Sequence, residues 1–334
     1  MGRSEPLAPR ARAGATPAMA EPAYALERRL LRVDDAAEDL AYVYAESGCP
    51  SDHEHDLFVS KLLPEYELQC GGVGVRCCQS DSSNLEKGIT GGIVWDAAVV
   101  LAKMLEALSA ARLCHVRGEA VLELGAGTGL LGLCAAALGA RAELTDQRPQ
   151  MRLMQRSKAL NDGALDCLRA ADAHSRAGRE SARASGPGGG GAEPFTVIVS
   201  ELDWEHFDAD DFVGAVAPGA ILCSDCVYNP SLIAPLVACA RQLCDAADAA
   251  ADCGEGGSRG CVVWFAMEVR AVDVLEEFVQ ALCGAFHVAR VPFELQAPSH
   301  SSRRCLVYAC RAKTPWDDSP HPDDLSDGDD QVAL

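Results

Sequence analysis

The stretch AVLELGAGTGLLGLCAAALGARAELTD, residues 120–146, decides the fold of this chain. Residues 121–124 are a short apolar run of β character, and three glycines follow at alternate positions. An Ala- and Leu-rich segment with high helix propensity comes next. Gly139 ends that helix, and a second strand runs to Asp146. This order of strand, loop, helix and strand predicts half of a doubly wound sheet, with a ligand beyond the carboxyl end of the first strand.

The glycine loop indicates a bound cofactor. Glycine has no Cβ, so a ligand can lie against bare backbone, and Asp146 is placed to accept hydrogen bonds from ribose hydroxyls. Nicotinamide dinucleotides and S-adenosylmethionine both fit this pattern. The dinucleotide fingerprint needs Gly or Ala where Leu130 stands. The alternative motif E-x-G-x-G-x-G favours S-adenosylmethionine and comprises Glu123, Gly125, Gly127 and Gly129.

The composition limits the partners. The 334 residues are 49% hydrophobic, enough for a large core, and 29 basic against 49 acidic residues give a net charge of −20. No basic run indicates nucleic-acid binding, whereas an acidic surface suits a basic protein substrate through long-range steering. Residues 314–334 hold seven Asp and no Lys or Arg, so we expect a disordered acidic tail.

Sixteen cysteines bear on the compartment. No apolar segment indicates a secretory signal or a membrane span, and the first 25 residues do not favour an organelle transit peptide. We therefore expect reduced thiols and a cytoplasmic location. The C-x-x-C pair Cys223 and Cys226, with Cys70, Cys77 and Cys78 elsewhere, leaves a zinc or redox site open as an alternative. No second C-x-x-C or histidine pair completes a ligand set, so no metal is predicted.

The remaining pattern predicts a single α/β domain. Residues 65–70 and 73–78 flank Gly71-Gly72 and predict a hairpin. An amphipathic helix begins at Trp95-Asp96. From Val121 onward we expect seven strands, with helices between the first five and an antiparallel pair at the end. The expected domain covers 57–313, with loop insertions near 163–193 and 247–260, after a flexible polar extension over 1–56.

Several motifs together resemble a known family. They are Gly92-Ile-Val-Trp95-Asp96, ELGAGTGL at 123–130, Leu202-Asp203-Trp204, Asp225-Cys-Val-Tyr228 and Met267-Glu268-Val269-Arg270. Over about 65–312 the chain is similar to the seven-β-strand protein-lysine methyltransferases of the methyltransferase family 16 domain. That family includes enzymes that modify 70-kDa heat-shock chaperones, valosin-containing protein and translation elongation factor 2. The resemblance implies the Rossmann-like, mostly parallel sheet of class I methyltransferases.

The resemblance also implies a function. It predicts an S-adenosylmethionine-dependent N-methyltransferase, acting as a monomer on lysines of a chaperone, AAA-ATPase or translation factor, with no nucleic acid or membrane partner. Asp225 would orient the lysine amine and Tyr228 would form a wall of its channel. Cys226 departs from the family, which usually has an aliphatic residue there. The implied cofactor contacts are Trp95, Gly125, Ala126, Gly127, Asp146, Trp204 and Ser224.

Three other functions stay open at this point. The chain could methylate another nucleophile, such as histidine, arginine or a small amine. It could be a scaffold that binds the cofactor without turnover, although the intact glycine loop and Asp225-x-x-Tyr228 argue against a degenerate site. A nicotinamide dehydrogenase is disfavoured by Leu130 and by the lack of a second substrate domain.

Overall fold

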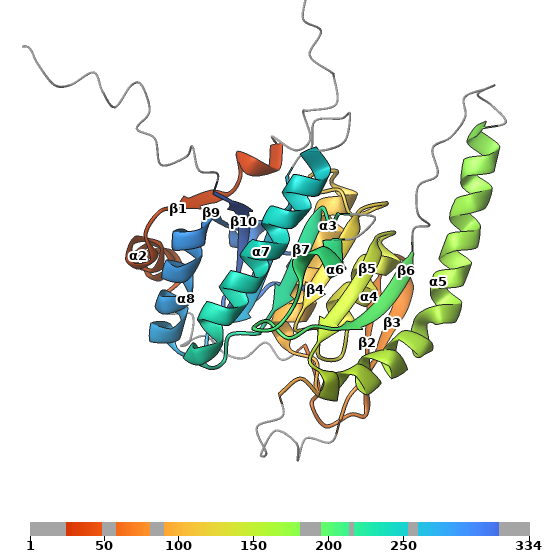
Figure 1. The fold of residues 1–334 in the computed structure, drawn as a ribbon, viewed down its shortest axis with the longest axis horizontal. Helices are drawn as coiled ribbons and strands as arrows, with labels where there is room; N and C mark the ends of the chain where they lie inside the picture. Colours follow the sequence, from red (N-terminus) through yellow and green to blue (C-terminus); the bar gives the residue numbers. More distant parts are fainter. Residues whose placement is uncertain are drawn as a thin grey trace, which may run out of the picture.

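A computed structural model describes residues 25–48, 58–80, 90–180, 195–213, 217–252 and 260–313. Eight of its strands form one sheet, in the order β1-β9-β10-β8-β7-β4-β5-β6 (Figure 1). The strands are β1 (Leu31–Val33), β4 (Ala120–Leu124), β5 (Arg141–Asp146), β6 (Thr196–Glu201), β7 (Ala220–Ser224), β8 (Val262–Glu268), β9 (Phe286–Arg290) and β10 (Cys305–Ala312). The α-helices are α2 (Ala36–Ser47), α3 (Asp96–Ala110), α4 (Leu130–Ala137), α5 (Met151–Glu180), α6 (Ala209–Val213), α7 (Ile233–Asp252) and α8 (Val272–Ala285).

The strand directions confirm the predicted α/β sheet. Strands β6, β5, β4, β7 and β8 are mutually parallel, and β10 runs antiparallel to both β8 and β9. The seven strands from β4 onward and the antiparallel pair at the end are therefore as expected. The parallel strands place their carboxyl ends at one edge, where a doubly wound sheet binds its ligand.

Helices cover both faces of this sheet. Adjacent side chains along a strand point to opposite faces, and in β4 Val121 belongs to one hydrophobic cluster while Leu122 belongs to the other. The first cluster contains α3 and α4 and the second contains α7 and α8. Figure 1 shows α7 and α8 together on one side of the sheet. The sheet is thus buried on both faces, as parallel sheets usually are.

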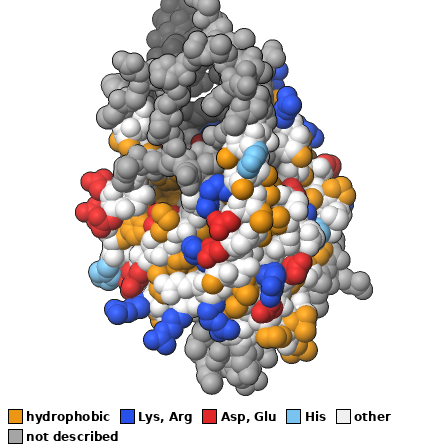
Figure 2. Space-filling model, turned by 90° about the vertical axis from the view of Figure 1, so that its right-hand side faces the viewer, with side chains coloured by type: hydrophobic (Ala, Val, Ile, Leu, Met, Phe, Trp, Pro, Cys, Tyr) orange, Lys and Arg blue, Asp and Glu red, His pale blue; other side chains and the backbone are white. Residues whose placement is uncertain are grey.

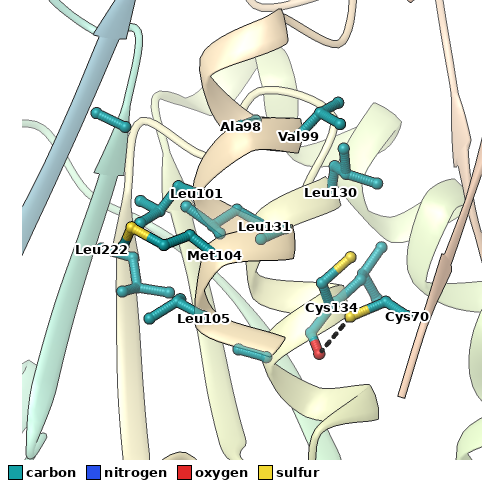
Figure 3. Packing of buried hydrophobic residues seen from close by; sticks show 14 of the residues in the cluster. Cys70, Ala98, Val99, Leu101, Met104, Leu105, Leu130, Leu131, Cys134 and Leu222 are labelled. Carbon is teal, nitrogen blue, oxygen red and sulfur yellow. Dashed lines mark hydrogen bonds between the residues drawn. The ribbon is translucent and has the colours of Figure 1, made fainter. Parts of the chain in front are cut away.

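The predicted hairpin is confirmed and packs outside the first helical layer. Its strands are β2 (Glu65–Cys70) and β3 (Val73–Cys78), joined at Gly71-Gly72. Gly71 has φ +61°, and a Cβ there would lie 2.5 Å from the carbonyl oxygen of Ala137 in α4. In Figure 3 the Cys70 thiol donates to the carbonyl of Cys134 at 3.9 Å, beside the α3–α4 contact. Close approach of the hairpin turn to α4 therefore requires glycine.

The expected flexible extension over 1–56 is wrong for residues 31–47. Strand β1 pairs with β9, and α2 packs against α8. The buried Asp39 carboxylate accepts from Arg290 Nε at 2.8 Å and from the Tyr308 hydroxyl at 3.0 Å. These partners lie about 250 residues away, so the local polar pattern of 31–47 did not reveal them. Residues 1–24 and 49–57 lie outside the described part.

Both expected loop insertions are shorter than predicted. Helix α5 continues through Gly163 to Glu180, and α7 continues to Asp252. The physical reason is composition, because residues 164–180 and 247–252 are rich in Ala and other helix formers. The two glycines within α5, Gly163 and Gly178, cost only about 1 kcal/mol each. Leu165 is also buried against the first cluster. Residues 181–194, 253–259 and the expected acidic tail 314–334 lie outside the described residues.

No helix within the described ranges is long and apolar enough to cross a membrane. Figure 2 shows acidic and basic side chains interspersed on the described part of one face, without a large patch of either sign.

The buried contact of Asp39 can be tested by substitution. Asp39→Ala removes both hydrogen bonds from a site where Arg290 is 1% exposed. Loss of one partner of a buried ion pair typically costs about 3–5 kcal/mol, so we expect a drop of that size in the free energy of unfolding, measured by urea denaturation. Asp34→Ala is the matched control, because its pair with Arg32 is exposed and should change stability by less than about 1 kcal/mol. Equal losses of stability in the two variants would contradict a stabilising role for the buried contacts of Asp39 with Arg290 and Tyr308.

Candidate active site

One cavity contains all the predicted site residues. It has a volume of about 320 Å³ and lies at the carboxyl ends of β4, β5, β6 and β7, beside the start of α3. The nine predicted residues in its lining are Trp95, Gly125, Ala126, Gly127, Asp146, Trp204, Ser224, Asp225 and Tyr228. A larger cavity of about 930 Å³ lies at the amino ends of the strands and contains none of them. The smaller cavity is the candidate site, because doubly wound sheets bind ligands at the carboxyl ends.

Contacts within the protein, as well as access of a ligand to the cavity, require glycine in this loop. Gly125 has φ +62°, and a Cβ there would lie 2.5 Å from Cys226 Sγ and 3.1 Å from Trp204 Cζ2. Gly127 has φ +55°, and its Cβ would lie 2.9 Å from the carbonyl oxygen of Gly91. The small Cys226 thiol thus fits against Gly125. Its departure from the usual aliphatic residue has a structural explanation.

Asp146 holds this loop while facing the cavity. One carboxylate oxygen accepts from the Gly127 N–H at 2.8 Å, and the other accepts from the Gln147 N–H at 2.7 Å. Burial raises the pKa of Asp146, and these two hydrogen bonds oppose the rise. A carboxylate has about four lone-pair sites, so Asp146 retains acceptor capacity for a ligand hydroxyl.

Glu123 supports the loop from below. Its carboxyl group is 2% exposed and accepts from the Gly132 N–H, near the start of α4, at 2.8 Å. Burial is the main cause that raises its pKa to about 8, and the nearby Asp146 adds to the rise. The glutamate that the motif placed before the glycines is therefore a buried support that also lines the cavity.

Asp225 is engaged by an arginine at the next strand end. Its side chain is 1% exposed and accepts from both terminal nitrogens of Arg270, at 2.9 and 2.5 Å. The Glu268 N–H donates to the same carboxylate at 3.2 Å. Arg270 also donates to the Glu268 carboxylate at 2.8 Å. Asp225 thus lines the cavity with a carboxylate already fixed in a bidentate pair, and its contact with a substrate amine stays a prediction.

Trp95 connects this ion pair to α3. The Arg270 guanidinium lies over the indole ring, with Cζ 4.6 Å from the centroid, and Lys61 Nζ lies 4.1 Å from the same centroid. The indole N–H donates to the Thr90 carbonyl at 3.1 Å. The next residue, Asp96, is buried, and burial together with the Glu268 charge raises its pKa to about 6. Trp95 is therefore held by cations and by its own loop.

The three remaining residues have mixed environments. Trp204 is half-buried, packs against the second hydrophobic cluster and lines the cavity, and its contact with a cofactor stays a prediction. Ser224 ends β7. Tyr228 is 52% exposed at the cavity mouth. An exposed aromatic at an opening is suited to contact with an incoming side chain.

The cysteines do not assemble a metal site in the described part of the chain. All 14 described cysteines are free thiols. The thiol of Cys226 donates to the Leu124 carbonyl at 3.5 Å, and a hydrogen bond with Cys223 and burial raise its pKa. Among described residues, the only trio of potential ligands close enough to hold a metal ion is Asp203, Glu205 and His206 at the surface. Cys223 and Cys226 are both buried in the second hydrophobic cluster.

Sequence reasoning missed two residues that contact the cavity lining without lining it themselves. Arg270 stood in the quoted Met267–Arg270 segment, but no role was assigned to it, although a basic residue after a buried acidic strand end is a usable signal. Lys61 carried no sequence signal, since it lies in a turn far from the glycine loop.

The raised pKa of Glu123 predicts a pH effect on stability. Between its ordinary pKa of 4.5 and about 8, the folded state binds more protons than the unfolded state, so stability falls as pH rises, by up to about 1.4 kcal/mol per unit. Glu123→Gln keeps an acceptor for Gly132 and removes this titration. Urea denaturation from pH 5 to 8 should show a flatter profile for the variant, with exposed Glu205→Gln as a control that follows the wild type. If the stability of all three proteins changed with pH in the same way, the raised pKa of the buried Glu123 carboxyl would be contradicted.

Comparisons with known proteins agree with the motifs. Residues 81–171 match the sequence model of a family described as lysine methyltransferase. The chain is 47% identical over 62 residues to protein N-lysine methyltransferase METTL21A of Danio rerio, which covers 19% of this chain and 27% of that protein. It is 45% identical over 69 residues to the protein of that name from Mus musculus, covering 21% and 30%.

The matched stretches thus span less than a third of these relatives. Among solved structures, magnesium protoporphyrin IX methyltransferase from Synechocystis has a TM-score of 0.38 at 14% identity, over 69% of this chain and 95% of that one. The matched segment runs from just before Trp95 through the glycine loop and Asp146 into α5. Residues 81–171 are therefore similar to the lysine methyltransferase family.

Proposed function

We propose that this chain is an S-adenosylmethionine-dependent protein-lysine N-methyltransferase. The observation that carries the proposal is the convergence of nine residues from four strand ends and the start of α3 on one cavity. The segment of the chain that matches the lysine methyltransferase family supplies five of them: Trp95, Gly125, Ala126, Gly127 and Asp146. The other four come from the ends of β6 and β7, outside that segment.

The cavity suits S-adenosylmethionine chemically. Its volume of about 320 Å³ is at the lower end of the range for small-molecule sites. Gly125 and Gly127 present backbone without side chains, and Asp146 offers acceptors for the ribose hydroxyls. Trp204 offers apolar area for the adenine ring. When bound, S-adenosylmethionine supplies an electrophilic methyl group.

The acceptor lysine must lose its proton to react. With an ordinary pKa near 10.4, deprotonation at pH 7 costs roughly 4–5 kcal/mol. Aromatic walls formed by Trp95 and Tyr228 would reduce hydration of the amine, which favours the neutral form. The protein thus favours a neutral nucleophile through its surroundings, without a strong base.

The Asp225–Arg270 pair acts by positioning. Both carboxylate oxygens are held by the guanidinium and Oδ1 also by the Glu268 N–H, so the orientation of the carboxylate and of its remaining lone pairs is fixed. A hydrogen bond from the lysine amine to one of them would align the nitrogen for in-line attack. Alignment of this kind accounts for much of the rate enhancement in two-substrate reactions.

The partner is proposed from charge and chemistry. The net charge of −20 supports attraction to a basic protein surface, and we retain a chaperone, AAA-ATPase or translation factor as the proposed substrate class. Free thiols at all described cysteines support a reducing compartment, for which we propose the cytoplasm. We also propose a monomer, which light scattering of the full chain tests.

Cofactor binding can be measured directly. Isothermal titration should give a dissociation constant for S-adenosylmethionine on the micromolar scale, and Asp146→Ala should weaken it by about tenfold or more, since a hydrogen bond to a charged group contributes roughly 1.5–3 kcal/mol. Asp162→Ala on the α5 surface is the matched control and should bind normally. Binding of NAD in place of S-adenosylmethionine would overturn the proposal.

Methyl transfer is the second test. With a radiolabelled methyl donor and candidate partner proteins, amino-acid analysis should find label in methyl-lysine. Arg270→Lys cannot form the bidentate pair, so its turnover should fall by about tenfold or more while its affinity for S-adenosylmethionine changes by less than about twofold. If the label were confined to histidine, arginine or small amines, the acceptor would be that group and not lysine. Unimpaired binding without any transfer would favour a scaffold.

A further inference from the structure

Lys61 holds an unusual position for a lysine in this chain. The sequence has only 5 lysines against 24 arginines. Lys61 Nζ lies 4.1 Å from the centroid of Trp95, whose ring lines the cavity. A cation over an indole face is attracted by the ring quadrupole. This places a lysine amine beside the wall that we propose for the acceptor lysine.

The backbone around Lys61 is fixed by buried groups. The Gln79 side-chain amide donates to the carbonyls of Ser60 and Leu63, at 3.0 and 2.9 Å. Its oxygen accepts from the Val94 N–H at 3.0 Å, directly before Trp95. At the other end of the turn, the Phe58 N–H donates to Asp96 at 3.2 Å. The turn is therefore attached to the start of α3 on both sides of Lys61.

The other described lysines lie elsewhere. Lys103 pairs with Glu106, and Lys158 pairs with Asp162 on α5. Lys313 lines the larger cavity at the opposite end of the strands. Lys87 lies outside the described residues. Within the described ranges, Lys61 is thus the lysine in contact with the wall of the candidate active site.

We propose that Lys61 is a methylation site and that the chain methylates it in its own active site. This inference rests on the proposed function. Lys61 does not line the cavity itself, but the fixed turn keeps it against Trp95, and the reaction requires its four-carbon stem to carry Nζ from the face of Trp95 into the cavity. In the reaction, the bond between the donor sulfur and the methyl carbon breaks as the carbon–Nζ bond forms. The ammonium proton passes to water, and S-adenosylhomocysteine leaves.

Methylation of Lys61 has a consequence for the site. A methylated ammonium ion keeps its positive charge and is well matched to an aromatic face. Modified Lys61 would therefore remain on Trp95, whose ring lines the cavity that a partner lysine must enter. Self-methylation would therefore place a methylated ammonium group beside the wall that we propose for the acceptor lysine.

The location of Lys61 can be measured without turnover. In the full chain labelled with ¹³C-lysine, the ε-methylene signal assigned by Lys61→Arg should be shifted upfield by the Trp95 ring. S-Adenosylhomocysteine, which has no methyl group to donate, should move that signal and leave the Lys158 signal unchanged. The proposed placement would be overturned if the Lys61 signal had the chemical shift of a free lysine and did not move when S-adenosylhomocysteine was added.

The transfer itself is tested by mass spectrometry of the full chain after incubation with S-adenosylmethionine carrying a deuterated methyl group. We expect label on the Lys61 peptide, with an initial rate per molecule that does not depend on protein concentration. Lys61→Arg should lose that label, whereas Lys158→Arg should retain it. Binding of the donor and transfer to partner proteins, with Lys61 unlabelled, would overturn this inference and leave the proposed function standing. A chain that does not bind the donor would overturn the proposed function and this inference with it.

Discussion

The ion pair between Asp225 and Arg270 is the constraint on which the acceptor side of the site depends. A carboxylate that is 1% exposed is stable only with a compensating charge, because the desolvation of an ion costs several kcal/mol. Arg270 supplies that charge and also lies over Trp95. The end of β7, the end of β8 and the start of α3 are thereby fixed relative to one another. The strand ends of a doubly wound sheet converge by topology, but this contact sets their side-chain geometry.

On the cofactor side of the site, contacts within the protein fix the glycine loop in a similar way. Cys226, one residue after the ion-paired Asp225, fits against Gly125, and the Gly91 carbonyl approaches Gly127. Asp146 and Glu123 then accept backbone N–H groups from the loop and from α4. The glycines are thus needed for contacts within the protein as well as for access of a ligand. Preorganisation of this kind reduces the ordering cost of binding.

The two sides meet at segments that are distant in sequence. The turn at Lys61 is attached to the start of α3 through Gln79, the residue directly after β3, although the hairpin packs outside the first helical layer. At the far edge of the sheet, Asp39 fixes α2 to β9 and β10 through Arg290 and Tyr308. Residues that looked like polar linkers therefore belong to the folded domain. Buried polar contacts of this kind tie an element to one partner, because a mispaired element would leave them unsatisfied.

The sequence by itself determined the sheet class, the hairpin and the glycine loop, because apolar periodicity and glycine spacing are local. The nine predicted site residues came from the family resemblance, and they line one cavity because the strand ends converge by topology. The sequence did not determine the lengths of α5 and α7, where the glycines of α5 and small polar residues suggested loops but tertiary packing and Ala content favoured helix. Nor did it reveal the folded state of residues 31–47, the pairing of Asp225 with Arg270, or the place of Lys61 on Trp95. Those depend on side chains brought together across 34 to about 250 residues, and only the tertiary structure decides such contacts.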